Sequence, residues 1–232
     1  MSDASAHMDR IYRWQTPIYD LTRKPYLLGR DKLIEALGPP IGGTVLEIGC
    51  GTGRNLIQAA RRWPHARYYG FDVSPVMLET ARRAVKQAGL SSRITLAAAD
   101  ASSFDAREVF GRVGFDRVFV SYSLSMIPQW RETLARGCDA LAPGGALLIA
   151  DFGDQARLPR AFRSVLYRWL AAFSVSPRLD LEDEMQSIAS RRGLVCDFER
   201  LYRGYAFLGM LRHVSRGSAP RARPVVTASL RH

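Results

Sequence analysis

The sequence predicts one α/β domain built on a doubly wound, mostly parallel sheet. Three observations predict this fold: short apolar runs alternate with helical segments, a glycine-rich turn follows the first run, and the second run ends in an acid. Strands joined by single helices need right-handed crossovers, which build a parallel sheet with helices on both faces. The length of 232 residues suits one such domain with additional caps.

The elements follow one another along the chain. The predicted strands are apolar runs bounded by turn residues: 44–48, 66–73, 94–98, 115–121 and 146–151. The predicted helices between them cover 55–62, 75–88 and 129–141. Ser74 and Pro75 mark a helix start, because a serine hydroxyl caps the first amides and proline suits the first turn. Pro143, Gly144 and Gly145 predict the turn that precedes the last of these strands.

Two segments lie outside this alternation, and we expect them to form helical caps around an acceptor pocket. One folding unit is predicted over 1–213, followed by a flexible basic tail at 214–232 that has no hydrophobic periodicity. Within the unit, the predicted parts are an N-terminal cap at 1–43, a core at 44–153, an acceptor-side and membrane-facing cap at 154–192, and final strands at 193–213.

Composition limits the partners. A formal charge of +11 favours a polyanion such as nucleic acid or an anionic lipid surface, although surface arginines can also serve solubility alone. No apolar run is long enough for a membrane-spanning helix, and the polar first ten residues lack a secretory signal, so we expect a cytoplasmic protein. Cys50, Cys138 and Cys196 are far apart and fit buried apolar positions better than a metal site.

The turn after the first strand predicts a ligand site. Gly49, Gly51 and Gly53 allow a sharp turn and a close approach of the backbone to a ligand. The dinucleotide fingerprint needs a third glycine where Arg54 stands, and no Gly-Lys-Ser/Thr follows, so nicotinamide and P-loop nucleotide sites are disfavoured.

Two acids support this prediction. Asp72 ends the second predicted strand about 20 residues after the turn, where a carboxylate can accept hydrogen bonds from a ribose diol; the alternative is an acid that only begins the next helix. Asp100 ends the third predicted strand, where a carboxylate and an adjacent amide can read an adenine edge.

Together these features, over 44–151, resemble the class I S-adenosylmethionine (SAM)-dependent methyltransferases. The resemblance implies a seven-stranded Rossmann-like sheet, SAM as cofactor, S-adenosylhomocysteine as product, and no metal. It implies that the glycines follow the methionine part, Asp72 holds the ribose, Val73 and Met77 flank the adenine, Asp100 and Ala101 face its amine, and the Ser121 carbonyl meets the ammonium. The residues expected to bind the cofactor are Glu47, Gly49, Gly51, Thr52, Gly53, Asp72, Val73, Met77, Asp100, Ala101 and Ser121.

The acceptor side argues against nucleic acid. Nucleic-acid amino methyltransferases of this fold commonly carry Asn or Asp, two prolines and an aromatic after the fourth strand, whereas this chain has the run 121–126, Ser-Tyr-Ser-Leu-Ser-Met. We therefore expect no nucleic-acid partner, despite the basic charge.

A basic amphipathic helix is predicted over 161–175. Its apolar positions recur at helical spacing: Phe162, Val165, Leu166, Trp169, Leu170 and Phe173. Arg163 and Arg168 occupy the remaining surface. Such a stripe commonly packs on a core, but Trp, Phe and Arg also suit a lipid head-group boundary. The first segment is similar, with aromatic and basic residues over 10–24.

A closer resemblance extends over nearly the whole chain. The runs 18–31, 121–128, 141–155 and 201–206 resemble bacterial diacylglyceryl-homoserine N-methyltransferases, which make the betaine lipid diacylglyceryl-trimethylhomoserine. Pro25 departs from the pattern, where an aromatic is expected. The resemblance implies a lipid amine as acceptor, a peripheral position at the inner face of an anionic membrane, and an upstream enzyme that builds the homoserine lipid.

Methyl transfer to an amine requires alignment of the reactants, exclusion of water and an unprotonated nitrogen. Tyr122, Tyr19 and Asp151 are the candidate catalytic residues, since each lies on a segment expected at the strand ends; Asp154 is a further candidate. Three alternatives stay open: a phosphatidylethanolamine N-methyltransferase, a small-molecule methyltransferase, and a SAM-binding or lipid-binding protein without turnover.

Overall fold

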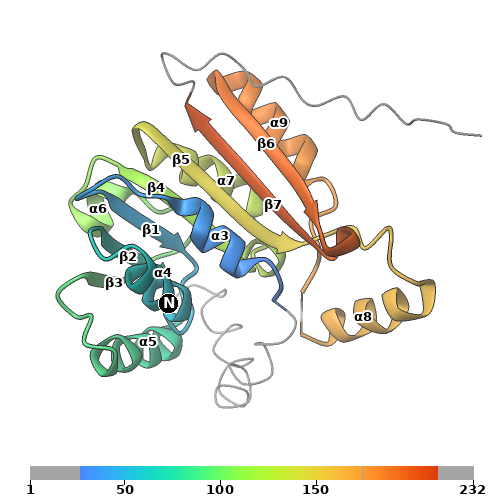
Figure 1. Cartoon of the computed structure of the whole chain (residues 1–232), viewed down its shortest axis with the longest axis horizontal. Coiled ribbons are helices and arrows are strands. Elements are labelled where there is room, and N and C mark those ends of the chain that lie inside the picture. Colours follow the sequence, from blue (N-terminus) through green and yellow to red (C-terminus); the bar gives the residue numbers. More distant parts are fainter. Residues whose placement is uncertain (1–26, 174, 214–232) are drawn as a thin grey trace, which may run out of the picture.

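Seven strands form a single sheet in the order β3-β2-β1-β4-β5-β7-β6 in the computed structural model, which describes residues 27–173 and 175–213 (Figure 1). The strands are β1 (Thr44–Ile48), β2 (Arg67–Asp72), β3 (Ile94–Ala98), β4 (Phe115–Ser121), β5 (Leu141–Phe152), β6 (Leu194–Leu201) and β7 (Ala206–His213). The first five are parallel, whereas β7 runs antiparallel to both β5 and β6. The predicted seven-stranded, mostly parallel, doubly wound fold is confirmed.

Helices cover both faces of this sheet. Those within the described residues are α3 (Arg30–Leu37), α4 (Arg54–Arg62), α5 (Pro75–Gln87), α6 (Ala106–Phe110), α7 (Trp130–Asp139), α8 (Arg160–Ala172) and α9 (Leu181–Arg192), with short 3-10 turns η1 (Leu124–Met126) and η2 (Tyr202–Gly204). The helices predicted over 55–62, 75–88 and 129–141 agree within two residues at each end, whereas the helix predicted over 161–175 ends three residues earlier, at Ala172. Helices α3, α6 and α9 were not predicted as separate elements.

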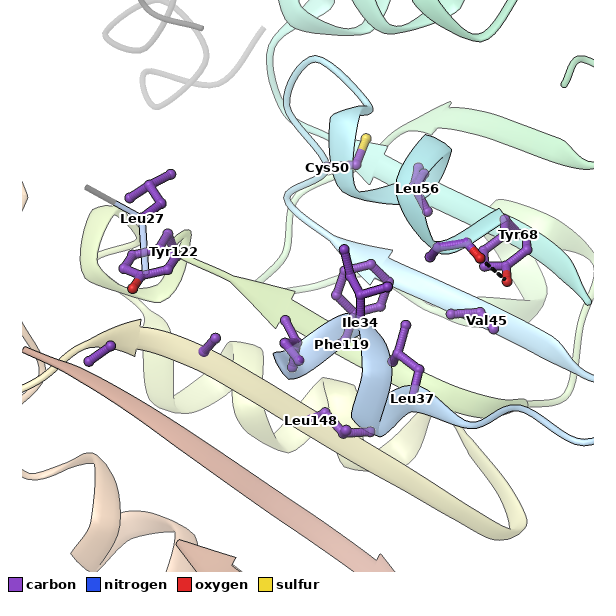
Figure 2. Close-up of a cluster of buried hydrophobic side chains, with 14 of the residues drawn as sticks. Leu27, Ile34, Leu37, Val45, Cys50, Leu56, Tyr68, Phe119, Tyr122 and Leu148 are labelled. Atoms are coloured by element: carbon purple, nitrogen blue, oxygen red, sulfur yellow. Dashed lines mark hydrogen bonds between the residues drawn. The ribbon is translucent and has the colours of Figure 1, made fainter. Parts of the chain in front are cut away.

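The core has two layers, because alternate residues of each strand face opposite sides of the sheet. On β5, Leu148 packs with α3 and α4, whereas Leu147 packs with α7 and α9. Figure 2 shows the first layer, in which Ile34 and Leu37 of α3 gather with Phe119 of β4 and Leu148.

Three details differ from the sequence-based expectation. Strand β5 begins at Leu141, so the predicted turn lies inside it as an irregularity that shifts its register with β4. Cys196 is only partly buried, whereas Cys50 and Cys138 are buried as predicted. Helix α9, in the second half of the predicted cap, packs on β6 and β7 through Leu181 and Met185.

Several predictions lie outside the described residues. They are the aromatic and basic N-terminal segment with Tyr19, the first half of the run 18–31, and the tail at 214–232. Across the described helices, none has both the length and the hydropathy that a bilayer-spanning segment requires.

Candidate cofactor site and the carboxyl edge of the sheet

The turn between β1 and α4 requires its glycines. Gly49, Gly51 and Gly53 have φ angles of 68°, 52° and 75°, which side-chain-bearing residues rarely adopt. A Cβ atom on Gly49 would lie 2.9 Å from the side chain of Ser123, so this position is also closely packed. The order of the strands reverses between β1 and β4, which is where parallel α/β sheets bind ligands.

Asp72 at the end of β2 holds this turn in place. Its Oδ2 accepts a hydrogen bond from the Gly51 amide at 2.8 Å, and its Oδ1 accepts one from the Ser74 amide at 2.9 Å. The carboxylate is therefore oriented by two backbone donors while it remains only half-buried.

Glu47 on β1 is fully buried beneath the same turn. The Asn55 side-chain amide donates to its Oε1 at 2.8 Å, whereas its Oε2 and the Asn55 Oδ1 have no partner within the described residues. Burial raises the pKa of Glu47 to about 8; the Asn55 hydrogen bond opposes this rise and the Asp72 charge adds to it. A buried carboxyl with an unpaired oxygen needs a donor, and a ligand can supply it.

Ser121 ends β4 beside the glycine turn. The pairing of Ile48 with Val120 places Ser121 level with Gly49. The Ser121 hydroxyl is buried and, among the residues that the structure describes, also has no hydrogen-bond partner. Unpaired buried polar atoms therefore occur at the ends of both β1 and β4, on the two sides of the switch point.

The remaining predicted cofactor residues lie at adjoining strand ends. Asp100 follows β3, and its Oδ1 accepts from the amide and hydroxyl of Ser102 at 2.8 and 2.7 Å, which fixes the loop after this strand. The others are half-buried or buried beside it or beside the turn: Thr52, Val73, Met77 and Ala101. The structure thus brings the whole predicted set to the carboxyl ends of β1 to β4.

Tyr122 follows β4 in a left-handed conformation, with φ of 57°. Its side chain is buried, its hydroxyl donates to the Leu28 carbonyl, and its ring lies edge-on to Phe152 at 4.8 Å between centroids. Burial, and then the charge of Asp151, raise its pKa well above the usual range. The phenol is therefore neutral at physiological pH and serves as a hydrogen-bonding group.

Asp151 near the end of β5 is fully buried. Its Oδ2 accepts from the Ser125 amide at 3.0 Å, and its Oδ1 accepts from the Phe152 amide at 2.7 Å. Burial raises its pKa, and its backbone hydrogen bonds oppose that rise. Arg178 lies near and donates to the Leu124 carbonyl at 3.0 Å. In this structure Asp151 orders the turn after β4; its catalytic role stays a prediction, as do those of Tyr122 and Tyr19.

Sequence reasoning missed Gln155. This residue follows β5 with φ of 57°, and it has no exposed surface. Its backbone amide donates a hydrogen bond to the Gly204 carbonyl at 2.8 Å. Neither polar atom of its side chain has a partner in residues 27–173 and 175–213. Every left-handed residue other than glycine in that part of the chain lies at this one edge: Tyr122, Gln155, Tyr202 and Arg203. Strained backbone and unpaired polar atoms are typical of a binding site.

Arg30 at the start of α3 was also missed. Its pKa is lowered by burial and by the charge of Arg54, and both Glu47 and Tyr122 lie within electrostatic range. Neither arginine forms an ion pair within the described part of the chain. Two guanidinium groups beside the glycine turn therefore favour an anionic ligand group.

Comparisons with known proteins agree with this geometry. Residues 45–145 match the family model described as a methyltransferase domain. The chain is 37% identical over 123 residues to the aklanonic acid methyltransferase DauC of Streptomyces sp. (strain C5), covering 52% of each chain. It is 29% identical over 164 residues to the methyltransferase GfsG of Streptomyces halstedii, covering 71% of this chain and 57% of the relative. It therefore spans about half the length of these curated relatives.

A solved structure extends the comparison to the fold. Phosphoethanolamine N-methyltransferase 2 of Haemonchus contortus, in complex with phosphomonomethylethanolamine and S-adenosylhomocysteine, superposes with a TM-score of 0.57 at 25% identity. The similarity covers 74% of this chain and 38% of that one.

Proposed function

We propose that this chain is a class I SAM-dependent methyltransferase that transfers methyl groups to the amine of diacylglyceryl-homoserine and so forms a betaine lipid. The domain match and the fold support a methyltransferase that uses SAM. The acceptor is the part of the proposal that goes beyond the family.

The residues present fit the cofactor. SAM carries an amino acid, a ribose and an adenine, and each has a counterpart here. Glu47 Oε2 and Asn55 Oδ1 are buried acceptors without partners among the described residues, as an ammonium group requires. Asp72 suits the ribose hydroxyls, and Arg30 with Arg54 suits the carboxylate.

One observation carries the acceptor proposal: the sequence runs that resemble the betaine-lipid enzymes meet at a single edge of the sheet. Hydrogen bonds join them in pairs: Tyr122 to Leu28, Tyr122 to Ala150, Ser125 to Asp151, Gly153 to Tyr205 and Gln155 to Gly204. These hydrogen bonds hold the four runs beside the predicted methyl-transfer site. Each run therefore depends on its neighbours for its position, which is a reason for the four runs to occur together in one sequence.

For methyl transfer, the main task of the protein is to position the two reactants. When bound, SAM would supply an electrophilic sulfonium methyl group to an unprotonated amine of the acceptor. Tyr122 is neutral and already donates to Leu28, so its oxygen can accept a hydrogen bond from the amine and orient the lone pair. Asp151 keeps the adjoining turn in place.

Other acceptors compete with this proposal. The solved neighbour from Haemonchus contortus is a phosphoethanolamine N-methyltransferase, and one curated relative methylates aklanonic acid, which is a small molecule. A phospholipid amine or a small molecule is therefore the alternative acceptor. The proposal also needs an upstream enzyme that makes the homoserine lipid, and a position at the inner face of the membrane.

Methyl-labelled SAM tests the acceptor directly. Purified protein is incubated with diacylglyceryl-homoserine, phosphatidylethanolamine or phosphoethanolamine in mixed micelles, and the labelled products are separated by thin-layer chromatography and identified by mass spectrometry. We expect label in mono-, di- and trimethylated homoserine lipid. Label only in an ethanolamine compound, or none in any lipid while S-adenosylhomocysteine still binds, overturns the acceptor and leaves the methyltransferase domain in place.

A further inference from the structure

Helix α8 has an apolar face that the core does not use. Leu166 and Leu170 belong to a buried hydrophobic cluster, with exposed fractions of 8% and 0%. Phe162 and Val165 are exposed, with exposed fractions of 50% and 67%. Packing on the core therefore covers only part of the stripe predicted from the sequence and leaves Phe162 and Val165 exposed.

The surface around this face is positively charged. No Asp or Glu occurs between Gln155 and Leu179. Four arginines on or beside the helix form no ion pair within the described residues: Arg157, Arg160, Arg163 and Arg168. An exposed phenylalanine and valine among unpaired arginines match a surface that is apolar inside and anionic outside, which is the boundary of a lipid bilayer.

The position of α8 connects this face to the site. In Figure 1 the helix stands apart from the two helical layers, beyond the sheet edge at which β5 ends. The segment between β5 and α8 is held in place by two backbone hydrogen bonds. The Leu158 amide donates to the Gln155 carbonyl at 3.1 Å, and the Gln155 amide donates to the Gly204 carbonyl of η2. A membrane contacted by α8 would therefore lie beside the proposed acceptor edge.

We propose that the α8 outer face, made of Phe162 and Val165 with Arg157, Arg160, Arg163 and Arg168, docks the protein on an anionic lipid bilayer. Phe162 and Val165 enter the acyl boundary, and the arginines contact lipid phosphates. This inference rests on the proposed function for its purpose, because a lipid amine must reach the site from a membrane.

Vesicle co-sedimentation of the full chain, without SAM or acceptor, tests the docking. The vesicles contain phosphatidylcholine alone or an equal mixture with phosphatidylglycerol. We expect binding to the anionic vesicles only, weakened by salt. The double variant Phe162→Ser/Val165→Ser should lower the binding constant at least about tenfold. Arg160→Gln/Arg168→Gln should lower it and reduce its salt dependence.

The matched control is Val113→Ser. Val113 has an exposed fraction of 78% and lies just before β4, at the amino ends of the parallel strands, opposite to the proposed acceptor site. It should bind vesicles like the wild type. Equal binding of the double variant and the wild type overturns the proposal, as does loss of a dimer in the double variant by light scattering, which would assign the face to a second copy. Methylation in mixed micelles is measured in parallel: its failure with vesicle binding intact counts against the proposed acceptor alone.

Discussion

Replacing Glu47 by glutamine should remove a pH dependence that this carboxyl imposes on the stability of the unliganded protein. Burial raises the pKa of Glu47 from 4.5 to about 8. Between these values the folded protein holds a proton that the unfolded chain has released, so the free energy of unfolding falls as the pH rises. From pH 5 to pH 8 this loss amounts to about 3.5 kcal/mol.

Urea unfolding of the wild type and Glu47→Gln, measured without ligand across this pH range, provides the assay. Other groups titrate alike in both proteins, so the difference in unfolding free energy should widen by about 3.5 kcal/mol in favour of the variant as the pH rises. Glutamine keeps the size of the side chain and an oxygen that can accept from Asn55. Glu35→Gln, at an exposed position of α3, controls for the general effect of losing a carboxylate.

If the unfolding free energies of the wild type and Glu47→Gln stay parallel across the pH range, the assignment of a buried, protonated Glu47 is refuted. A second readout concerns the ligand. Because an ammonium group favours the ionised carboxylate, binding of S-adenosylhomocysteine near neutral pH should release about one proton from the wild type and none from Glu47→Gln. Calorimetry in two buffers of different ionisation enthalpy measures this release.

Four further changes test the site. Asp72→Ala should weaken S-adenosylhomocysteine binding at least about tenfold in calorimetry, because hydrogen bonds to a carboxylate are lost; unchanged affinity would contradict the ribose assignment. Tyr122→Phe should slow methylation about tenfold or more while changing cofactor affinity little, and equal losses would indicate a structural role. Gln155→Met should raise the free energy of unfolding by about 1 kcal/mol while raising the KM for the acceptor; a variant that gains no stability would mean that the carboxamide is not unpaired. Arg30→Ala should weaken S-adenosylhomocysteine about tenfold and leave methylthioadenosine, which lacks the amino-acid part, unaffected; similar losses for both ligands would exclude a carboxylate contact.

The geometry of the proposed cofactor side could be predicted from the sequence because its signals are local. Three glycines within five residues need left-handed backbone, and the structure gives all three positive φ angles. Asp72 ends the next strand, so its distance from the turn along the chain is set by one helix and one strand. The bounds of β1 follow an apolar run for the same reason, since this strand is buried on both faces.

Other features could not be predicted in this way. Helix α3 has only eight residues and lies within the predicted N-terminal cap, for which no helix bounds were predicted. Helix α9 carries its apolar residues at helical spacing, but its acidic first turn and basic last turn also suit an exposed cap. For Gln155 and Arg30 no local motif exists: their burial and their missing partners arise only when η2, α4 and the ends of β4 and β5 come together.

The cofactor side was predictable and the acceptor side was not, because the backbone is held in a different way on each side. The left-handed residues of the cofactor turn are glycines, which adopt this conformation at little cost. At the proposed acceptor edge, Tyr122, Gln155, Tyr202 and Arg203 adopt this conformation with side chains, at a cost of the order of 1 kcal/mol each. Hydrogen bonds between distant segments must offset that cost, as the bond from Gln155 to Gly204 does. A change in any one of these segments therefore alters the shape that an acceptor meets while leaving the glycine turn intact. Acceptor choice can thus vary among proteins that share the same cofactor site.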